Sequence, residues 1–286
     1  MSRPYRFGFS EFTTWPWAFK KDVERYSAHG ADCIEVCEFK LAHDDYGDDL
    51  ASIAKAGMTV ASVQAKVHSI FVDSMAPVPK DPRDRVRAIR DAIELSAPHL
   101  PKDTPFIVIT GAPPDGNMRE AIETTVESLK ELGDVAARHG MKIAFEPLSP
   151  INVNTDTAVW GLDHGLDLVE RVNHPAVGIC VDTWNVWETP DLPQVIRRCG
   201  NRILVVQLSD WKTPRSTADR YSLGTGEIDL AGTIRAIRAT GFAGPWVVEI
   251  LSSLHLDGSL WKSDMDDVLR KNREAFERLW NESGAA

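Results

Sequence analysis

Short runs of apolar residues recur eight times along the chain. They cover residues 5–10, 33–39, 59–67, 106–110, 142–148, 177–184, 203–210 and 246–251. Each run is short, rich in β-branched and aromatic residues and bounded by turn residues, which predicts a buried β-strand. Most are continuous rather than alternating, a pattern typical of parallel strands that are covered on both faces.

Amphipathic segments lie between these runs. In residues 121–136, for example, apolar side chains recur at spacings of three and four, which predicts a helix. A glycine falls just before many of the following strands, where a helix end needs a residue that tolerates the left-handed conformation. These glycines are Gly30, Gly57, Gly140, Gly200 and Gly241.

Eight repeats of strand and helix predict an α/β fold, a (β/α)8 TIM barrel. The alternative is an open, doubly wound sheet, which would usually carry a glycine-rich phosphate loop after its first strand, and residues 10–14 are not such a loop. The chain has 286 residues, 43% of them hydrophobic, and no linker or low-complexity stretch divides it. We therefore expect residues 1–286 to form a single domain, with a final helix at about 261–282.

The charge balance limits the classes of molecule that the chain is expected to bind. With 32 basic and 42 acidic residues the net charge is -10, which disfavours nucleic acid and anionic lipid. No apolar run reaches the roughly 18 residues of a membrane span, and the N-terminus lacks the apolar region of a signal peptide. We expect a cytoplasmic protein whose four cysteines are packing residues rather than disulfides.

Four successive strands in the second half each carry a polar residue near the carboxyl end. These residues are Glu146, Asp182, Gln207 and Glu249. A buried charge without a partner is costly, and three carboxylates on neighbouring strands would also repel one another. A shared divalent cation is the simplest common partner, and salt bridges to arginines of the barrel are the alternative.

The motifs around these residues resemble the sugar phosphate isomerase/epimerase superfamily, the xylose isomerase-like TIM barrels, over nearly the whole chain. That superfamily includes ketose 3-epimerases, hydroxypyruvate isomerases, inosose and dehydroshikimate dehydratases, and endonuclease IV-like nucleases. The motifs are Glu146-Pro-Leu, Val181-Asp182-Thr-Trp184, Leu208-Ser-Asp210-Trp211, the glycines of residues 220–229, and Val248-Glu249.

The resemblance implies that Glu146, Asp182, position 207 and Glu249 bind one metal ion. The chain departs from the family pattern with Gln207, where histidine is commonest, and with Asn185, where many relatives have another histidine. A glutamine carbonyl is still an oxygen donor. An oxygen-rich set favours Mn2+ first, with Mg2+ or Co2+ as alternatives.

Other residues of the same rim are candidates for substrate binding. His68 could bind substrate or shuttle protons, or it could be structural. Trp184 and Asn185 follow the sixth strand, and a flat indole ring can stack on the apolar face of a sugar. Arg220 could bind an anionic or hydroxyl group, with a surface salt bridge as the alternative.

Two insertions follow strands at this rim, residues 71–84 and residues 211–227 with Arg215. Each is either a lid or substrate contact, or an ordinary surface loop. Asp210 is expected to orient a ligand or a loop. The tryptophans of this rim could stack on a sugar, or some of them could pack against loops or against a second subunit of a homo-oligomer. They are Trp15, Trp17, Trp184, Trp187 and Trp211.

Together these features predict a metal-dependent isomerase or epimerase that acts on a small keto-sugar or polyol. The fifth and eighth strands lie roughly 135° apart around an eight-stranded ring, so Glu146 and Glu249 would approach a substrate from different sides as proton-transfer groups. A metal ion would make the C–H beside a carbonyl more acidic and hold the resulting enediolate.

The alternative activity is a lyase on the same scaffold, of inosose, 3-dehydroshikimate or 3-keto-glycoside type, which Gln207 favours. Two other classes remain. The acidity of the chain argues against an endonuclease IV-like nuclease, and the intact carboxylates argue against a non-catalytic sugar-binding barrel.

Overall fold

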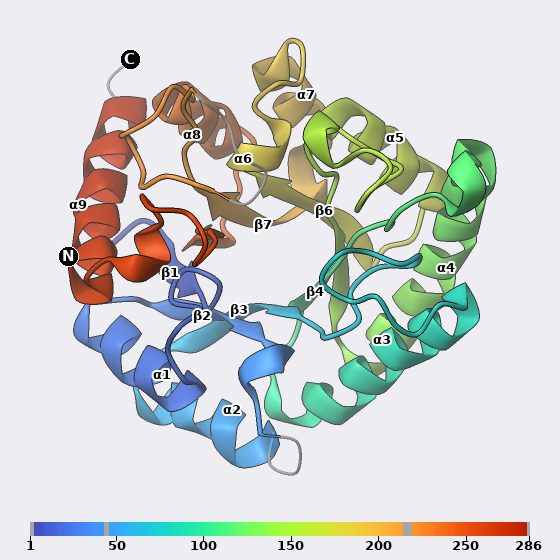
Figure 1. Cartoon of the computed structure of the whole chain (residues 1–286), viewed down its shortest axis with the longest axis horizontal. Coiled ribbons are helices and arrows are strands. Elements are labelled where there is room, and N and C mark those ends of the chain that lie inside the picture. Colours follow the sequence, from blue (N-terminus) through green and yellow to red (C-terminus); the bar gives the residue numbers. More distant parts are fainter. Residues whose placement is uncertain (1–2, 43–45, 214–218, 285–286) are drawn as a thin grey trace.

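The computed structural model describes residues 3–42, 46–213 and 219–284, and within them eight parallel strands form a closed barrel. Each strand pairs with the next in sequence, and β8 pairs with β1 (Figure 1). The (β/α)8 barrel expected from the sequence is therefore confirmed. The strands are β1 Arg6–Ser10, β2 Cys33–Cys37, β3 Thr59–Gln64, β4 Pro105–Val108, β5 Lys142–Phe145, β6 Val177–Asp182, β7 Ile203–Leu208 and β8 Pro245–Val248.

Helices surround the barrel and cover the outer face of the sheet (Figure 1). The longest of the described helices is α4, Met118–His139. At its start the Asn117 side chain accepts a hydrogen bond from the Glu120 backbone N–H, and it ends at Gly140, whose φ is 72°. The helices are α1 Phe19–Ala28, α2 Tyr46–Lys55, α3 Pro82–Ser96, α4 Met118–His139, α5 Leu162–Val172, α6 Thr183–Val186, α7 Leu192–Cys199, α8 Leu230–Ala239 and α9 Met265–Gly284.

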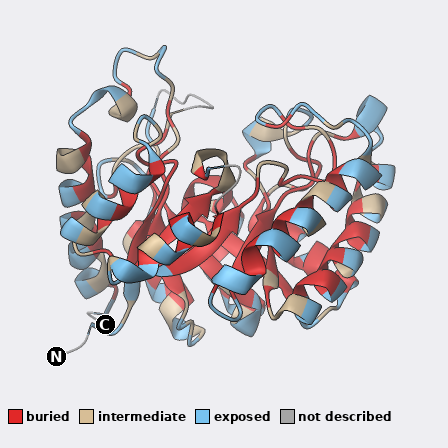
Figure 2. Cartoon of the chain, turned by 90° about the horizontal axis from the view of Figure 1, so that it is seen from below, coloured by how far each residue is buried: buried red, intermediate tan, exposed pale blue. Residues whose placement is uncertain are grey.

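Buried apolar side chains form two clusters, one on each face of the sheet. The larger fills the space between strands and helices, and Figure 2 shows the strands mostly buried and the helices exposed on their outer faces. The smaller cluster includes Ala61, Ala144 and Cys180 together with the larger Ile107, and it fills the inside of the barrel. All four cysteines are free and buried, in keeping with a packing role.

Several strands end earlier than the apolar runs that predicted them. β5 ends at Phe145 and β8 at Val248, so Glu146 and Glu249 are the first residues beyond their strands. Their backbone N–H groups still bond the neighbouring strands, from Glu146 to Val108 O and from Glu249 to Leu208 O. The final helix starts at Met265 rather than about 261, because residues 260–262 form a separate 3-10 turn.

The loop between β3 and α3 is anchored by a buried cation in the first turn of α3. Arg85 donates hydrogen bonds to the carbonyls of Ser69 at 2.9 Å, Ala76 at 2.8 Å and Pro79 at 2.8 Å. It also pairs with Asp73, with 3.0 Å between Nη2 and Oδ2. Three carbonyls and a carboxylate of the loop thus bind one guanidinium, and these contacts attach the loop to α3.

The loop after β7 is held by Asp210, whose carboxylate accepts hydrogen bonds from the backbone N–H groups of Trp211, Gly226 and Ile228. The loop-orienting role expected of Asp210 is thereby observed. Arg215 lies outside the described residues. Among the described helices, none has the length and the apolar character that crossing a membrane would require.

Candidate active site

Three carboxylates of the described chain converge at the carboxyl ends of β5, β6 and β8. Glu146, Asp182 and Glu249 each offer an oxygen, and these atoms all lie within 4.8 Å of one another. Their exposed fractions are 6%, 0% and 3%. Since divalent cations bind oxygen ligands at about 2.0–2.6 Å, one ion can bridge atoms that are this close. The three residues are called the pocket cluster below.

Burial changes the acidity of the pocket cluster. It is the main cause that raises the pKa of Glu249 and of Glu146 well above the ordinary value, and the nearby charge of Asp182 adds to the rise for Glu146. Burial also raises the pKa of Asp182, although the charge of Arg220 opposes the change. These carboxyl groups therefore hold protons more firmly than exposed ones do.

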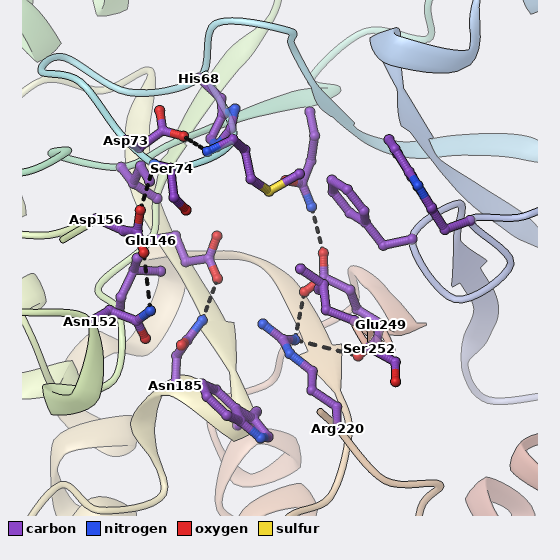
Figure 3. Close-up of a pocket in the computed structure, with 18 of the residues that line it drawn as sticks. His68, Asp73, Ser74, Glu146, Asn152, Asp156, Asn185, Arg220, Glu249 and Ser252 are labelled. Atoms are coloured by element: carbon purple, nitrogen blue, oxygen red, sulfur yellow. Dashed lines mark hydrogen bonds and ion pairs between the residues drawn. The ribbon is translucent and has the colours of Figure 1, made fainter. Parts of the chain in front are cut away.

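Arg220 lies among the carboxylates. Its Nη1 atom is 2.8 Å from Oδ2 of Asp182 and 2.7 Å from Oε2 of Glu249, as Figure 3 shows for Glu249. Its guanidinium carbon lies 5.1 Å from the centre of the Trp184 ring. Burial lowers the pKa of Arg220, but the surrounding carboxylates outweigh it and leave the pKa raised. The salt bridge that was the alternative explanation of the carboxylates is thus present for two of them.

Asn185 connects two members of the pocket cluster. Its amide nitrogen donates to Oε1 of Glu146 at 2.7 Å and to Oδ2 of Asp182 at 2.8 Å. Its carbonyl oxygen accepts from the backbone N–H of Ser149 at 3.1 Å, which fixes the orientation of the amide. Asn185 therefore holds the carboxylates in place, in addition to facing the cavity where it was predicted to bind substrate.

Gln207 presents its amide nitrogen, rather than its carbonyl oxygen, to the acidic groups. The nitrogen donates to Oε1 of Glu249 at 3.0 Å and to Oε1 of Glu35 at 2.9 Å, while the carbonyl oxygen accepts from the thiol of Cys180. Metal ligation by the Gln207 oxygen would require the amide to turn over. That role remains a prediction.

The first half of the barrel contributes two residues that the sequence interpretation missed. Glu35 of β2 is fully buried and accepts hydrogen bonds from Ser62 at 2.6 Å and from Gln64 at 2.9 Å, besides that from Gln207. Gln64 also donates to Glu249. In the sequence Glu35 could have been recognised as a charged residue at the centre of the apolar run Cys33–Cys37.

A cavity of about 420 Å3 opens above these groups. It is lined by six of the residues predicted from the sequence, whereas Asp182 and Gln207 are fully buried behind its wall. The Nδ1 atom of His68 lies 3.2 Å from the carbonyl oxygen of Ala65. The six lining residues are His68, Glu146, Trp184, Asn185, Arg220 and Glu249.

Comparisons with known proteins identify the family of the chain. The family model described as xylose isomerase-like TIM barrel matches residues 23–276. A 3-dehydroshikimate dehydratase from Pseudomonas putida is 34% identical over 137 residues, which are 44% of this chain and 20% of that enzyme. An L-ribulose 3-epimerase from Methylomonas sp. is 27% identical over 180 residues, 59% of each chain. The chain thus spans only part of the length of these relatives.

Solved structures extend the likeness to the whole fold. The structure of protein SMc04130 from Sinorhizobium meliloti 1021 has a TM-score of 0.82 and 26% identity, and the match covers 97% of this chain and 99% of the other. The IOLI protein, whose structure carries a zinc atom, has a TM-score of 0.80 and 20% identity, with 98% and 100% covered.

Proposed function

The chain belongs to the xylose isomerase-like TIM barrel family, and from this premise we propose that it is a divalent-metal-dependent isomerase or epimerase of a keto-sugar or polyol. One observation carries the proposal. The oxygens of Glu146, Asp182 and Glu249 lie within 4.8 Å of one another. Glu146 and Glu249 line a cavity, with Asp182 buried behind them, on the face where TIM-barrel enzymes place their active sites.

The donor set fits a hard or borderline divalent cation. Glu146, Asp182 and Glu249 would hold it, with the Gln207 carbonyl as a fourth ligand after its amide has turned. Oxygen donors favour Mn2+, and Mg2+ and Co2+ are also suited to them. When bound, the ion supplies positive charge that polarises a substrate carbonyl and makes the adjacent C–H more acidic.

The protein contributes the proton-transfer groups. Glu146 and Glu249 follow strands on different sides of the ring, so each can reach a different face of a substrate carbon. Burial raises the pKa of both groups, which favours the protonated form that a general acid needs. Asn185 holds Glu146, and the amides of Gln64 and Gln207 hold Glu249, so that neither carboxyl group is free to rotate.

A lyase is the second candidate. Gln207 places N–H donors where an imidazole is commonest in the family, and the relative that is 34% identical is a dehydratase. Both activities begin with removal of the proton beside the carbonyl. They differ afterwards, because an isomerase returns the proton to carbon, whereas a lyase expels a leaving group.

Incubation with keto-sugars and inososes in D2O, with Mn2+ added, tests the proposal. An isomerase or epimerase should give a product of the substrate's own mass plus deuterium at the carbon beside the carbonyl, read by mass spectrometry and NMR. Loss of water or of an aglycone, with a new ultraviolet band, would favour the lyase. Full activity in EDTA, with no metal found by elemental analysis, would overturn the metal dependence.

A further inference from the structure

One wall of the cavity is aromatic. The rings of Phe12 and Trp15 stack at 5.4 Å with an interplanar angle of 17°, and those of Trp15 and Trp261 at 6.2 Å with an angle of 24°. The indole N–H of Trp261 donates to the carbonyl of Phe12 at 2.8 Å and also bonds that of Ile250. These rings follow the neighbouring strands β1 and β8, and all three line the cavity. They form a continuous surface, called the aromatic wall below.

The opposite wall is polar. Ser74 follows β3, and Asn152 and Asp156 follow β5, which lies across the barrel from β1. The backbone N–H of Ser74 donates to Oδ1 of Asp156 at 2.7 Å, and the amide of Asn152 donates to its Oδ2 at 3.3 Å. Figure 3 shows these side chains together with Asp73 on one side of the pocket. A substrate between the walls meets hydrogen-bonding groups on one side and flat rings on the other.

The cavity has little to offer an anion. Among the described residues that line it, Arg220 and His68 are the basic side chains, against the acids Asp73, Asp156, Glu146 and Glu249. Arg220 is already paired with Asp182 and Glu249. Phosphate and carboxylate groups are normally held by arginines, lysines or backbone N–H groups that are not engaged elsewhere.

A second observation also argues against a binding site for an anion. In TIM barrels a phosphate often binds at loops after the seventh and eighth strands and at a helix N-terminus. Here α8 follows β7, and its N-terminus is capped by the carboxylate of Asp229, which accepts from the backbone N–H of Gly232 at 2.8 Å. A negative group already occupies the position that would attract a phosphate.

We propose that this site selects an uncharged polyhydroxy carbonyl substrate and stacks its apolar face on the aromatic wall, and that it discriminates against phosphorylated and carboxylated analogues. The inference rests on the proposed function, whose substrate class it narrows. The polar wall receives the hydroxyl groups, while the carbonyl end reaches the pocket cluster. A phosphate or carboxylate would have to break the ion pairs of Arg220 or lie against buried carboxyl groups.

Binding is compared for two pairs of compounds, by tryptophan fluorescence in the presence of Mn2+ and without relying on turnover. The first pair is L-ribulose and L-ribulose 5-phosphate, and the second is an inosose and 3-dehydroshikimate. The neutral member of each pair should bind at least about tenfold more tightly. Equal or tighter binding of the charged members overturns the inference. Absence of turnover with every compound would instead sink the proposed function, since binding is measured separately.

Variants separate the two parts of the inference. Trp15→Leu should weaken binding of L-ribulose roughly tenfold, because a stacking surface is lost. Trp160→Leu is the control, since Trp160 does not line the cavity. Met75 lines it and is 38% exposed, so Met75→Arg adds a cation without burying it. That variant, unlike Met75→Gln, should shift preference at least fivefold toward L-ribulose 5-phosphate. Unchanged binding in Trp15→Leu, or unchanged preference in Met75→Arg, counts against the corresponding part.

Discussion

Of two clusters of buried acidic side chains in the barrel, the pocket cluster opens onto the cavity and the other does not. The second set, called the closed cluster, consists of Glu11, Asp22 and Lys40 beside β1 and α1. Lys40 Nζ lies 2.6 Å from Oδ2 of Asp22, and the hydroxyl of Thr14 donates to Oδ1 at 2.6 Å. The Lys40 and Asp22 side chains are 7% and 0% exposed. Glu11 accepts a hydrogen bond from the backbone N–H of Cys37.

The two clusters share burial and altered acidity, so neither property identifies a catalytic site by itself. Burial raises the pKa of Glu11 well above its usual value and that of Asp22 to a lesser degree, as it does in the pocket cluster. What differs is the balance of charge. In the closed cluster one lysine faces two carboxyl groups, those of Glu11 and Asp22. In the pocket cluster Arg220 faces three carboxylates, and Glu35 adds a fourth nearby.

The largest effect should come from neutralising matching acids in the two clusters. Glu249→Gln should lower kcat by about 10²–10⁴, the usual contribution of a general acid or base, while the thermal midpoint changes little. Glu11→Gln should keep most of the activity, because Glu11 does not line the cavity and an amide has nearly the same size and shape as the carboxyl group that it replaces. Steady-state kinetics with Mn2+ measure both. More than a tenth of the wild-type kcat in Glu249→Gln would remove the functional distinction between the clusters.

Removal of the Lys40 charge from the closed cluster should lower stability and leave activity nearly unchanged, the reverse of the effect expected for Glu249→Gln. Lys40→Met leaves Asp22 buried without its charge partner, which should cost about 3–5 kcal/mol of the free energy of unfolding. Activity per folded molecule should be retained. Urea unfolding measures the loss, with Lys20→Met on the exposed face of α1 as the control. A loss below about 1 kcal/mol would show that Lys40 does not stabilise the closed cluster as inferred.

A substitution at Gln207 tests whether this side chain contacts an ion that is bound by the pocket cluster. Gln207→His should keep a bound ion but shift the preference toward Zn2+ and Co2+ by at least about tenfold, because imidazole is a nitrogen ligand. Competition between metals, read by elemental analysis, measures the ranking. The same ranking in both proteins would mean that Gln207 does not contact the ion and acts as the hydrogen-bond donor that the structure shows.

The smallest effect concerns pH and the closed cluster. The pKa of Glu11 is raised mainly by burial, so the folded protein keeps a proton there that the unfolded chain releases above about pH 4.5. The stability due to this proton is complete below that pH and is lost as the pH rises toward the folded-state pKa. Glu11→Gln removes the loss, so its stability should fall less steeply than that of the wild type between pH 5 and 8. Parallel urea-unfolding curves across that range would contradict the assignment.

Much of the fold follows from local patterns that the sequence displays. The eight apolar runs and the glycines before them predicted the barrel, and the single carboxylates after the fifth, sixth and eighth strands predicted that Glu146, Asp182 and Glu249 would meet. Both results depend on strand order and on the fact that parallel strands bring their carboxyl ends to one side.

Other features depend on contacts between distant segments, and periodicity does not encode these. Glu35 joins the site from β2 through the hydrogen bond that it accepts from Gln207 of β7. The orientation of the Gln207 amide depends on Cys180 and Glu35, two residues on other strands. The position of Arg220 depends on an irregular loop, so its pairing with Asp182 and Glu249 could be named only as an alternative.

The hydrogen bonds and the ion pair between Arg85 and the loop after β3 limit how such a pocket can acquire a new specificity in evolution. The wall of the cavity that contains Asp73 and Ser74 is folded around a guanidinium that belongs to α3, not to the loop itself. A loop transplanted alone would lose the donor for its carbonyls, and an Arg85 left without them would be a buried cation lacking acceptors. Residues 69–85 should therefore be exchanged as one block, because an exchange at the apparent loop boundary would separate Arg85 from its acceptors.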